Sequence, residues 1–241
     1  MMNSVFIIIQ SFFAVGGGLF FLAKRKQGLP FKKGWNKFFV YMAVVNLISY
    51  SISHNPLFFK IIALIIVSQG FFEICKALLL NKSSKIFAFF TLSVYSLLAF
   101  GFIMFSSLPT QIMIWTYLAI FLFDGFSQIS GQLVGKKPLA PSISPNKTME
   151  GLFGGLLLSL GSLYFLDHIT GFSSFQSLFF GLLICIGALL GDLLASLVKR
   201  KCGIKDYGRI LPGHGGILDR FDSFLFGGAM MYVLFNLLPI Q

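Results

Sequence analysis

Long apolar runs with few charges are the feature that most limits how this chain can fold. Several runs exceed the roughly 18 residues that a helix needs to cross a bilayer. Only 11% of the residues are charged, whereas a soluble domain carries roughly 25%, so the chain lacks the polar surface that water requires on all sides. The runs predict an all-α, polytopic membrane protein with about eight transmembrane helices, over residues 5–23, 38–53, 57–80, 86–105, 112–134, 149–166, 175–198 and 217–238.

The first apolar run differs from a secretory signal peptide. Residues 1–4 carry no basic residue, and the basic cluster of residues 24–26 follows the run instead of preceding it. No cleavage site of small residues is evident. We therefore expect a helix that the protein retains.

Positive charge is divided unevenly between the two ends of the predicted helices. If successive helices alternate in direction, 18 of the 19 Lys and Arg residues fall at one end, and only Lys60 falls at the other. The positive-inside rule makes the basic end cytoplasmic and places both termini outside. The net charge of +11 is therefore a topology signal that also suits anionic membrane lipids, and we expect no nucleic-acid partner.

The eight acidic residues are concentrated in the C-terminal half. Glu73 is the exception, and its spacing of three from Lys76 predicts an ion pair within one helix. Asp167 falls in a short outer loop, where water would solvate it. We therefore divide the chain into N-terminal transmembrane helices (1–110) and a C-terminal catalytic region with cytoplasmic loops (111–241). The remaining six acids all fall in the second region: Asp124, Glu150, Asp192, Asp206, Asp219 and Asp222.

Asp192 is predicted to lie inside a membrane helix, roughly 10 Å from its inner end at ~1.5 Å per residue. A carboxylate at that depth costs a few kcal/mol unless it has a partner or a water-filled cavity. Ser196, Lys199 and Arg200 follow at spacings that place them on the same helix face. Either an internal Asp192–Ser196 contact with snorkelling basic residues or a polar site explains this pattern.

The segment from Lys199 to Ser223 reads KRKCGIKDYGRILPGHGGILDRFDS. Its glycines let backbone N–H groups approach a ligand, and the helix start adds a positive dipole end. Asp219 and Asp222 then share one helix face, where a carboxylate also has a purely structural use as a dipole partner. Oxygen ligands, a glycine loop and several Lys and Arg residues together are what a nucleoside triphosphate requires.

These residues resemble the signature of the phosphatidate cytidylyltransferase (CDP-diacylglycerol synthase) family. The match reads Ser196-x-x-Lys199-Arg200, Lys205-Asp206 and Leu211-Pro212-x-His214-Gly215-Gly216-x-x-Asp219-Arg220-x-Asp222. Residues 144–151, preceded by Gly135-Lys136-Lys137, resemble a cytoplasmic loop of the family, and residues 191–193 resemble the start of its penultimate-helix motif. The resemblance covers residues 121 to 240, and the N-terminal half adds only apolar helices.

The resemblance implies a nucleotidyltransferase that transfers CMP from CTP to phosphatidic acid, giving CDP-diacylglycerol and pyrophosphate. It implies Mg²⁺, with room for a second cation, at a centre held by Asp192 and Asp219 with Asp222 close by. His214 is expected to donate a hydrogen bond to a phosphate, to act as a general acid, or simply to form a hydrogen bond within the loop. The residues expected to bind substrate are Ser196, Lys199, Arg200, Lys205, Asp206, Gly215, Gly216, Arg220, Lys147 and Thr148.

The same resemblance implies a multi-pass protein of the bacterial inner membrane with its active site on the cytoplasmic side. A homodimer is a further expectation from the family. Two departures from the family pattern stand out. Ala195 replaces a Glu that often precedes the signature serine, and residues 125–128 differ from the usual Ser-Gly-Ala-Tyr after Asp124, so the role of Asp124 is left open.

Two other functions fit parts of the sequence. Intramembrane aspartates often mark ion paths, which would suit an ion-coupled transporter, although no internal repeat supports one. A CTP-dependent enzyme that acts on a different lipid phosphate, or a polyprenol kinase, would need similar phosphate machinery. The phosphorus that enters the lipid distinguishes these enzymes: it is the α-phosphorus of CTP for a cytidylyltransferase and the γ-phosphorus for a kinase.

The predicted topology can be tested by labelling. A single cysteine placed in the 201–210 loop, in a chain whose native cysteines are replaced, should react with a membrane-impermeant maleimide only from the inside of the membrane. Labelling of that cysteine from outside in sealed cells would overturn the predicted orientation.

Overall fold

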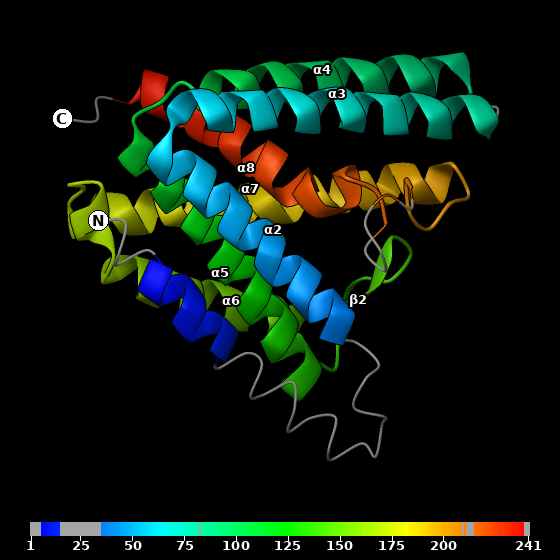
Figure 1. Cartoon of the computed structure of the whole chain (residues 1–241). Coiled ribbons are helices and arrows are strands. Elements are labelled where there is room, and N and C mark those ends of the chain that lie inside the picture. The colour runs from blue at the N-terminus through cyan, green and yellow to red at the C-terminus, as the bar shows by residue number, and fades with distance from the viewer. Residues whose placement is uncertain (1–5, 15–34, 82, 209, 211–214, 239–241) are drawn as a thin grey trace.

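The structure, a computed structural model, describes residues 6–14, 35–81, 83–208, 210 and 215–238 (Figure 1). Residues 6–14 are helical, and the rest of the predicted first helix lies outside the described residues. The predicted all-α class is confirmed, and the other predicted helix ends agree to within three residues. The helices are α2 (Trp35–His54), α3 (Pro56–Leu80), α4 (Lys85–Phe105), α5 (Thr110–Val134), α6 (Met149–Tyr164), α7 (Ser174–Lys201) and α8 (Leu218–Leu237), with a short 3₁₀ turn η1 (Asp167–Ile169).

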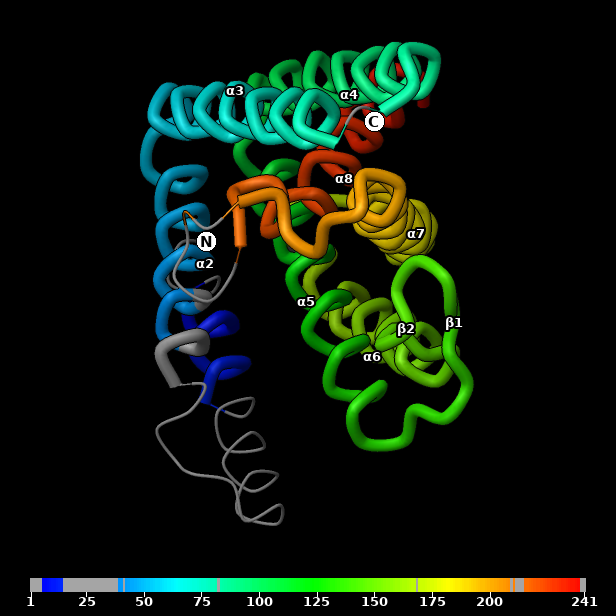
Figure 2. Tube along the Cα trace, turned by 90° about the vertical axis from the view of Figure 1, so that its right-hand side faces the viewer, coloured from blue at the N-terminus to red at the C-terminus, as the bar shows by residue number. Residues whose placement is uncertain are grey.

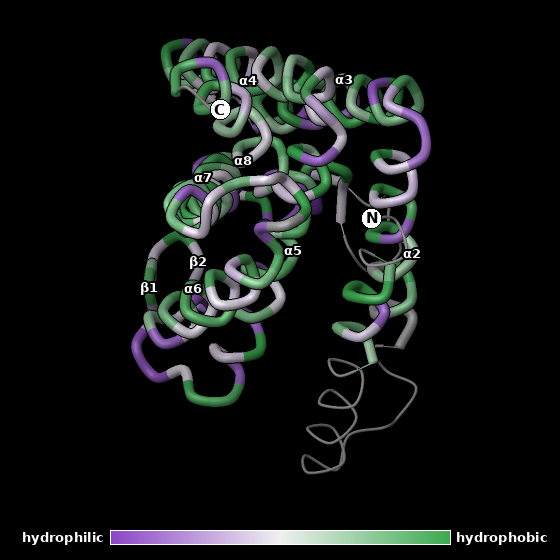
Figure 3. Tube along the Cα trace, turned by 90° about the vertical axis from the view of Figure 1, so that its left-hand side faces the viewer, coloured by the Kyte–Doolittle hydropathy of each residue, from purple (hydrophilic) through white to green (hydrophobic). Residues whose placement is uncertain are grey.

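Four of these helices, α3, α4, α5 and α7, are long and apolar enough to cross a membrane. Large apolar side chains such as Phe89 and Leu97 remain exposed on the outer surface of the bundle, where water would penalise them and lipid would not. Figure 3 shows apolar residues along the helices and many of the hydrophilic residues in the connections. The chain is a multi-pass membrane protein.

Helix α8 is surrounded by helices from both halves of the chain. Helices α3 and α4 lie side by side along one face of the bundle, with α8 and α7 beneath them (Figure 1). The ring of Phe224 on α8 meets Phe59 of α3, Phe102 of α4 and Tyr117 of α5 at centroid distances of 6.1, 5.0 and 5.0 Å. Such aromatic pairs hold the helices in register beyond simple area burial.

Small residues allow close contacts between helices. A Cβ on Gly191 of α7 would lie 2.6 Å from the backbone oxygen of Asp222 on α8, and Gly187 meets the side chain of Met230. Gly151 and Gly155 likewise lie against Ser127 of α5. The small-xxx-small spacing on α6 and α7 therefore does bring backbones together.

Three connections meet at one end of the bundle. They are the α3–α4 turn, the segment between α5 and α6, and the α7–α8 loop (Figures 1 and 2). The middle segment contains an antiparallel hairpin of β1 (Pro138–Ala140) and β2 (Ser144–Thr148), which the sequence analysis expected only as a loop. This end carries the motif residues, and it is the end at which the sequence predicted the basic residues to gather.

A matched pair of glycine substitutions should test the α7–α8 packing. Gly191→Ala places a methyl group against a backbone carbonyl, which cannot swing away, so we expect a loss of about 1–3 kcal/mol in stability. Gly161→Ala on α6 meets nothing within 4 Å, so the better helix propensity of alanine should leave stability unchanged or raise it by about 1 kcal/mol or less. Thermal unfolding in detergent measures both, and equal midpoints would contradict this packing.

Candidate active site

The carboxylate of Asp219 joins three segments at the start of α8. Its Oδ1 lies 2.8 Å from Lys199 Nζ on α7, and its Oδ2 accepts hydrogen bonds of 2.8 Å from the backbone N–H groups of Tyr207 and Gly216. Only 3% of the side chain is exposed. Gly215 has a φ of 86°, and a Cβ there would lie 2.6 Å from Asp219 Oδ2. The glycine is therefore required on both counts.

The loop after α7 is folded onto that helix by local bonds. Gly203, with a φ of 67°, follows the helix, and the Ile204 N–H donates to the carbonyl of Lys199 at 2.9 Å, a glycine-dependent way to end a helix. The hydroxyl of Tyr207 donates to the carbonyl of Ala195 at 3.0 Å. The Lys199 ammonium also lies 5.5 Å from the centre of the Tyr207 ring.

Glu73 has different partners from the ones predicted. It is 2% exposed, and its two carboxylate oxygens accept hydrogen bonds of 2.9 Å from the N–H groups of Ile217 and Leu218. The expected ion pair with Lys76 is not among the salt bridges of the described residues. The prediction was wrong because the free N–H groups at a helix start offer a buried carboxylate better partners than a lysine at the surface.

Asp192 is paired with a cation from the hairpin. Lys147 Nζ on β2 lies 2.5 Å from Asp192 Oδ2, and the Ser196 hydroxyl donates to Asp192 Oδ1 at 3.3 Å. The Asp192–Ser196 contact is thus present, together with the partner that a carboxylate at this position needs. Burial acts to lower the pKa of Lys147, but the carboxylates of Asp192, Asp124 and Asp222 outweigh it, so this pKa is raised.

Asp124 and Asp222 complete an acidic cluster with Asp192. Asp222 is 8% exposed and accepts a hydrogen bond of 2.8 Å from the Ser223 N–H. Asp124, on α5, lies within electrostatic reach of Asp192 and Lys147. Asp222 interacts with the charges of both other acids. Three helices therefore bring their carboxylates together, and we call Asp124, Asp192 and Asp222 the acidic cluster.

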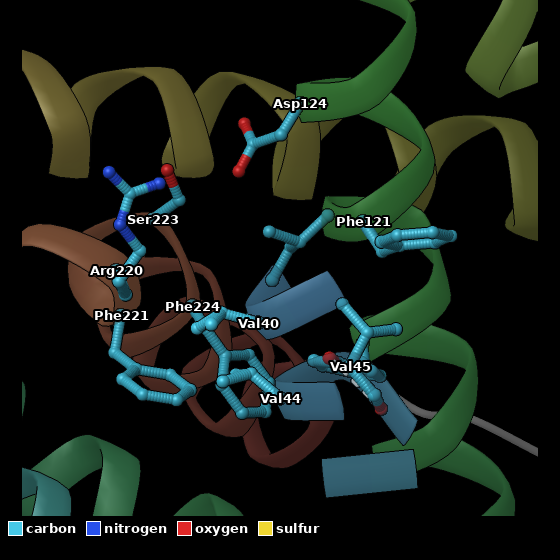
Figure 4. A pocket seen from close by; sticks show the side chains of 11 residues that line it. Val40, Val44, Val45, Phe121, Asp124, Arg220, Phe221, Ser223 and Phe224 are labelled. Atoms are coloured by element: carbon cyan, nitrogen blue, oxygen red, sulfur yellow. Dashed lines mark hydrogen bonds between the residues drawn. The ribbon is translucent and has the colours of Figure 1, made fainter. Parts of the chain in front are cut away.

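Asp124 was the residue whose role the sequence left open. Helix α5 continues through it to Val134. Figure 4 shows its carboxylate directed toward Ser223 and Arg220 of α8, above a cavity of about 40 Å³ whose other walls are mostly apolar. The signal that indicates its importance is the one used for Asp192, a lone acid in an apolar run.

Two predicted substrate-binding residues have structural contacts. The Arg200 Nε donates to the carbonyl of Ile143 at 3.2 Å, and its Nη1 donates to that of Ile204 at 3.3 Å, which holds the hairpin against the end of α7. The Thr148 hydroxyl accepts from the Gly151 N–H at 3.1 Å and caps α6.

The other predicted residues that the structure describes line two hollows. Lys205 and Asp206 are exposed and line an open hollow of about 500 Å³ together with Lys76. Arg220 borders the small cavity beside Asp124. His214 lies outside the described residues.

A divalent metal ion such as Mg²⁺ needs several oxygen ligands around one point. No group of three or more His, Cys, Asp and Glu residues in this part of the chain has metal-binding geometry. Both oxygens of Asp219 are engaged by Lys199 and by backbone N–H groups. The acidic cluster offers only carboxylate oxygens, the donors that Mg²⁺ prefers, and its Asp192 contacts Lys147. The donor chemistry of the cluster fits Mg²⁺, and the metal assignment stays a prediction.

Comparison with known proteins places this site in context. A family model described as "Cytidylyltransferase family" matches residues 2–238. The chain is 46% identical over 129 residues to a phosphatidate cytidylyltransferase of Helicobacter pylori, covering 53% of this chain and 48% of the relative. It is 41% identical over 168 residues to the Staphylococcus haemolyticus protein of the same name, covering 67% and 62%. The chain thus spans about half to three fifths of the length of these relatives.

The hydrogen bonds of Asp219 predict a cost in stability when its charge is removed. Asp219→Asn places an NH₂ group where the carboxylate accepts hydrogen bonds from Lys199 and from two backbone N–H groups, and it leaves Lys199 without its ion pair. We therefore expect the free energy of unfolding to fall by about 1–3 kcal/mol. Asp206→Asn, at an exposed position, should change stability by about 0.5 kcal/mol or less. Thermal unfolding in detergent compares the two, and an unchanged Asp219→Asn midpoint would contradict the described network.

Proposed function

Because the chain belongs to the cytidylyltransferase family, we propose that it transfers CMP from CTP to phosphatidate and releases pyrophosphate. The observation that carries this proposal is the meeting of the acidic cluster with Lys147 and Lys199 at one end of an apolar bundle. Carboxylates and cations so close together suit phosphate chemistry at a membrane surface. The names of the relatives support phosphatidate as the acceptor.

The reaction requires no covalent enzyme intermediate. An oxygen of the phosphatidate phosphate attacks the α-phosphorus of CTP, and a new P–O bond forms. The bond from the α-phosphorus to the oxygen shared with the β-phosphorus breaks, and pyrophosphate leaves with that electron pair. The protein's task is to align both phosphates and neutralise their charge.

The basic residues around the centre serve this neutralisation. Lys147 and Lys199 already lie beside carboxylates, so an arriving phosphate shares cations that are held in place. Arg220 borders the small cavity beside Asp124, and Lys205 lines the open hollow beside the α7–α8 loop. Arg200 keeps the hairpin, and thus Lys147, close to the end of α7.

Mg²⁺ is part of this proposal. We expect Asp192 and Asp222, with Asp124 beside them, to hold it once Asp192 exchanges its contact with Lys147. Asp219 would likewise have to release one of its present donors. When bound, the ion would neutralise phosphate charge and orient the phosphates. The residues around it would still have to fix the geometry of both substrates.

We place the site on the cytoplasmic side of a bacterial inner membrane. The basic connections lie at the end of the bundle that carries the site, and positively charged connections favour the cytoplasmic side. CTP is soluble there, and the lipid phosphate lies at the same interface. The basic end also attracts anionic lipid headgroups.

Radiolabelled CTP tests the reaction. The purified full chain, given Mg²⁺ and phosphatidate in mixed micelles, should move ³²P from [α-³²P]CTP into lipid and release the label of [γ-³²P]CTP as pyrophosphate. Label from the γ position in lipid would indicate a kinase instead. No transfer from either position, in a protein that remains folded, would overturn the proposed function.

The acidic cluster is tested in the same assay by Asp192→Asn. Removal of one charge from the centre should lower the rate by about 100-fold or more, with the protein still eluting as a single species in detergent. Asp167→Asn is the matched control and should keep the wild-type rate, because Asp167 is the first residue of η1 and its carboxylate accepts a hydrogen bond from the Ser174 hydroxyl. Near-normal turnover of Asp192→Asn would show that this carboxylate is not needed.

A further inference from the structure

Helix α3 contributes a residue to the site although the sequence assigns its half of the chain only apolar spans. We propose that Glu73 is a positioning residue: it fixes the glycine loop and the start of α8, and through them Asp219 and Asp222. The expected effect of Glu73 on the reaction rate rests on the proposed function. Its role in holding the loop and the start of α8 is argued from its contacts alone.

Both carboxylate oxygens of Glu73 accept hydrogen bonds from the start of α8. Its Oε1 accepts from the Ile217 N–H and its Oε2 from the Leu218 N–H, both at 2.9 Å. A helix start leaves such N–H groups without a partner inside the helix, and its dipole favours a negative charge. Glu73 is 2% exposed and Leu218 is 3% exposed. Water therefore has little access to these N–H groups to replace the carboxylate.

Two glycines let the loop close over this carboxylate. A Cβ on Gly216 would collide with the carboxylate of Glu73, and a Cβ on Gly208 would lie 3.1 Å from its Oε1. That Cβ would also lie 3.3 Å from the Cα of Gly216. The two sides of the loop therefore meet directly above Glu73, with no space for a side chain between them.

The position of Glu73 in the bonding network connects it to the reacting centre. Leu218, whose N–H it binds, directly precedes Asp219, and Asp222 follows one helical turn later. The Gly216 N–H, one residue before the bonds to Glu73, donates to Asp219. A shift of the helix start would therefore move both acids together, and misplacement by about 1 Å can cost ~100-fold in rate.

Three variants of this residue test the inference. Glu73→Gln keeps the shape of the side chain but places its NH₂ group opposite one of the two backbone N–H groups. One hydrogen bond to the helix start is then lost, so we expect kcat to fall about tenfold or more. The KM for CTP should change by about threefold or less, because Glu73 does not touch the nucleotide. Glu73→Asp keeps both acceptors at a shorter reach and should recover part of the lost kcat, whereas Glu73→Ala should be the least active.

Phe59→Leu is the matched control. Phe59 lies on the same helix, is fully buried and packs on Phe224 of α8, about 21 Å along α3 from Glu73 at ~1.5 Å per residue. It should lower the unfolding temperature without lowering kcat at a temperature where the protein is folded. If Glu73→Gln lowers kcat no more than Phe59→Leu does, Glu73 is only a structural residue and the proposal fails.

Trypsin provides a measurement that does not depend on catalysis. Lys205 is exposed in the same loop, so loosening of the loop in Glu73→Gln should speed cleavage after Lys205, while Phe59→Leu should leave this cleavage rate unchanged. Unchanged cleavage in Glu73→Gln would overturn the positioning role. If instead the wild-type protein transfers no CMP but the cleavage rates differ as expected, the proposed function fails and the loop contact stands.

Discussion

The site depends on one constraint: carboxylates held inside an apolar bundle must have partners. Asp219 satisfies it with Lys199 and two backbone N–H groups, and Glu73 satisfies it with the start of α8. The bonds of Glu73 join segments 144 and 145 residues apart, and that of Asp219 to Lys199 joins residues 20 apart. Because an unpaired buried carboxylate costs several kcal/mol, the need to pair the acids also fixes the loop and the helix ends that carry them.

The charges of the site are arranged in two pairs. Lys147 meets Asp192, and Lys199 meets Asp219, so each cation stays close to the centre before any phosphate arrives. Asp124 and Asp222 add negative charge beside the first pair. Such an arrangement can exchange partners when an anionic substrate and a divalent ion enter, since the total charge is then redistributed within a small region.

The two halves of the chain meet at α8. Phe224 packs against Phe59 and Phe102 of the N-terminal half, and Gly101 of α4 lies against Ala229 with space for no larger residue. Glu73 adds a polar contact at the other end of the same interface. The N-terminal helices therefore support the helix that carries two of the site's acids, as well as spanning the membrane.

The sequence by itself determined the helices and predicted most of the residues that surround the acidic cluster. Apolar run length is a local property, so the ends of α3 to α8 could be predicted closely, and the motif from Ser196 to Asp222 named most of the site. Only the tertiary structure decided the partners of Glu73, the surroundings of Asp124 and the cation that pairs with Asp192. Glu73 binds an N–H group 144 residues away, and Lys147 reaches Asp192 from a hairpin. Neither helical periodicity nor residue spacing can predict such long-range contacts, because the contacts form only when packed helices bring their ends together.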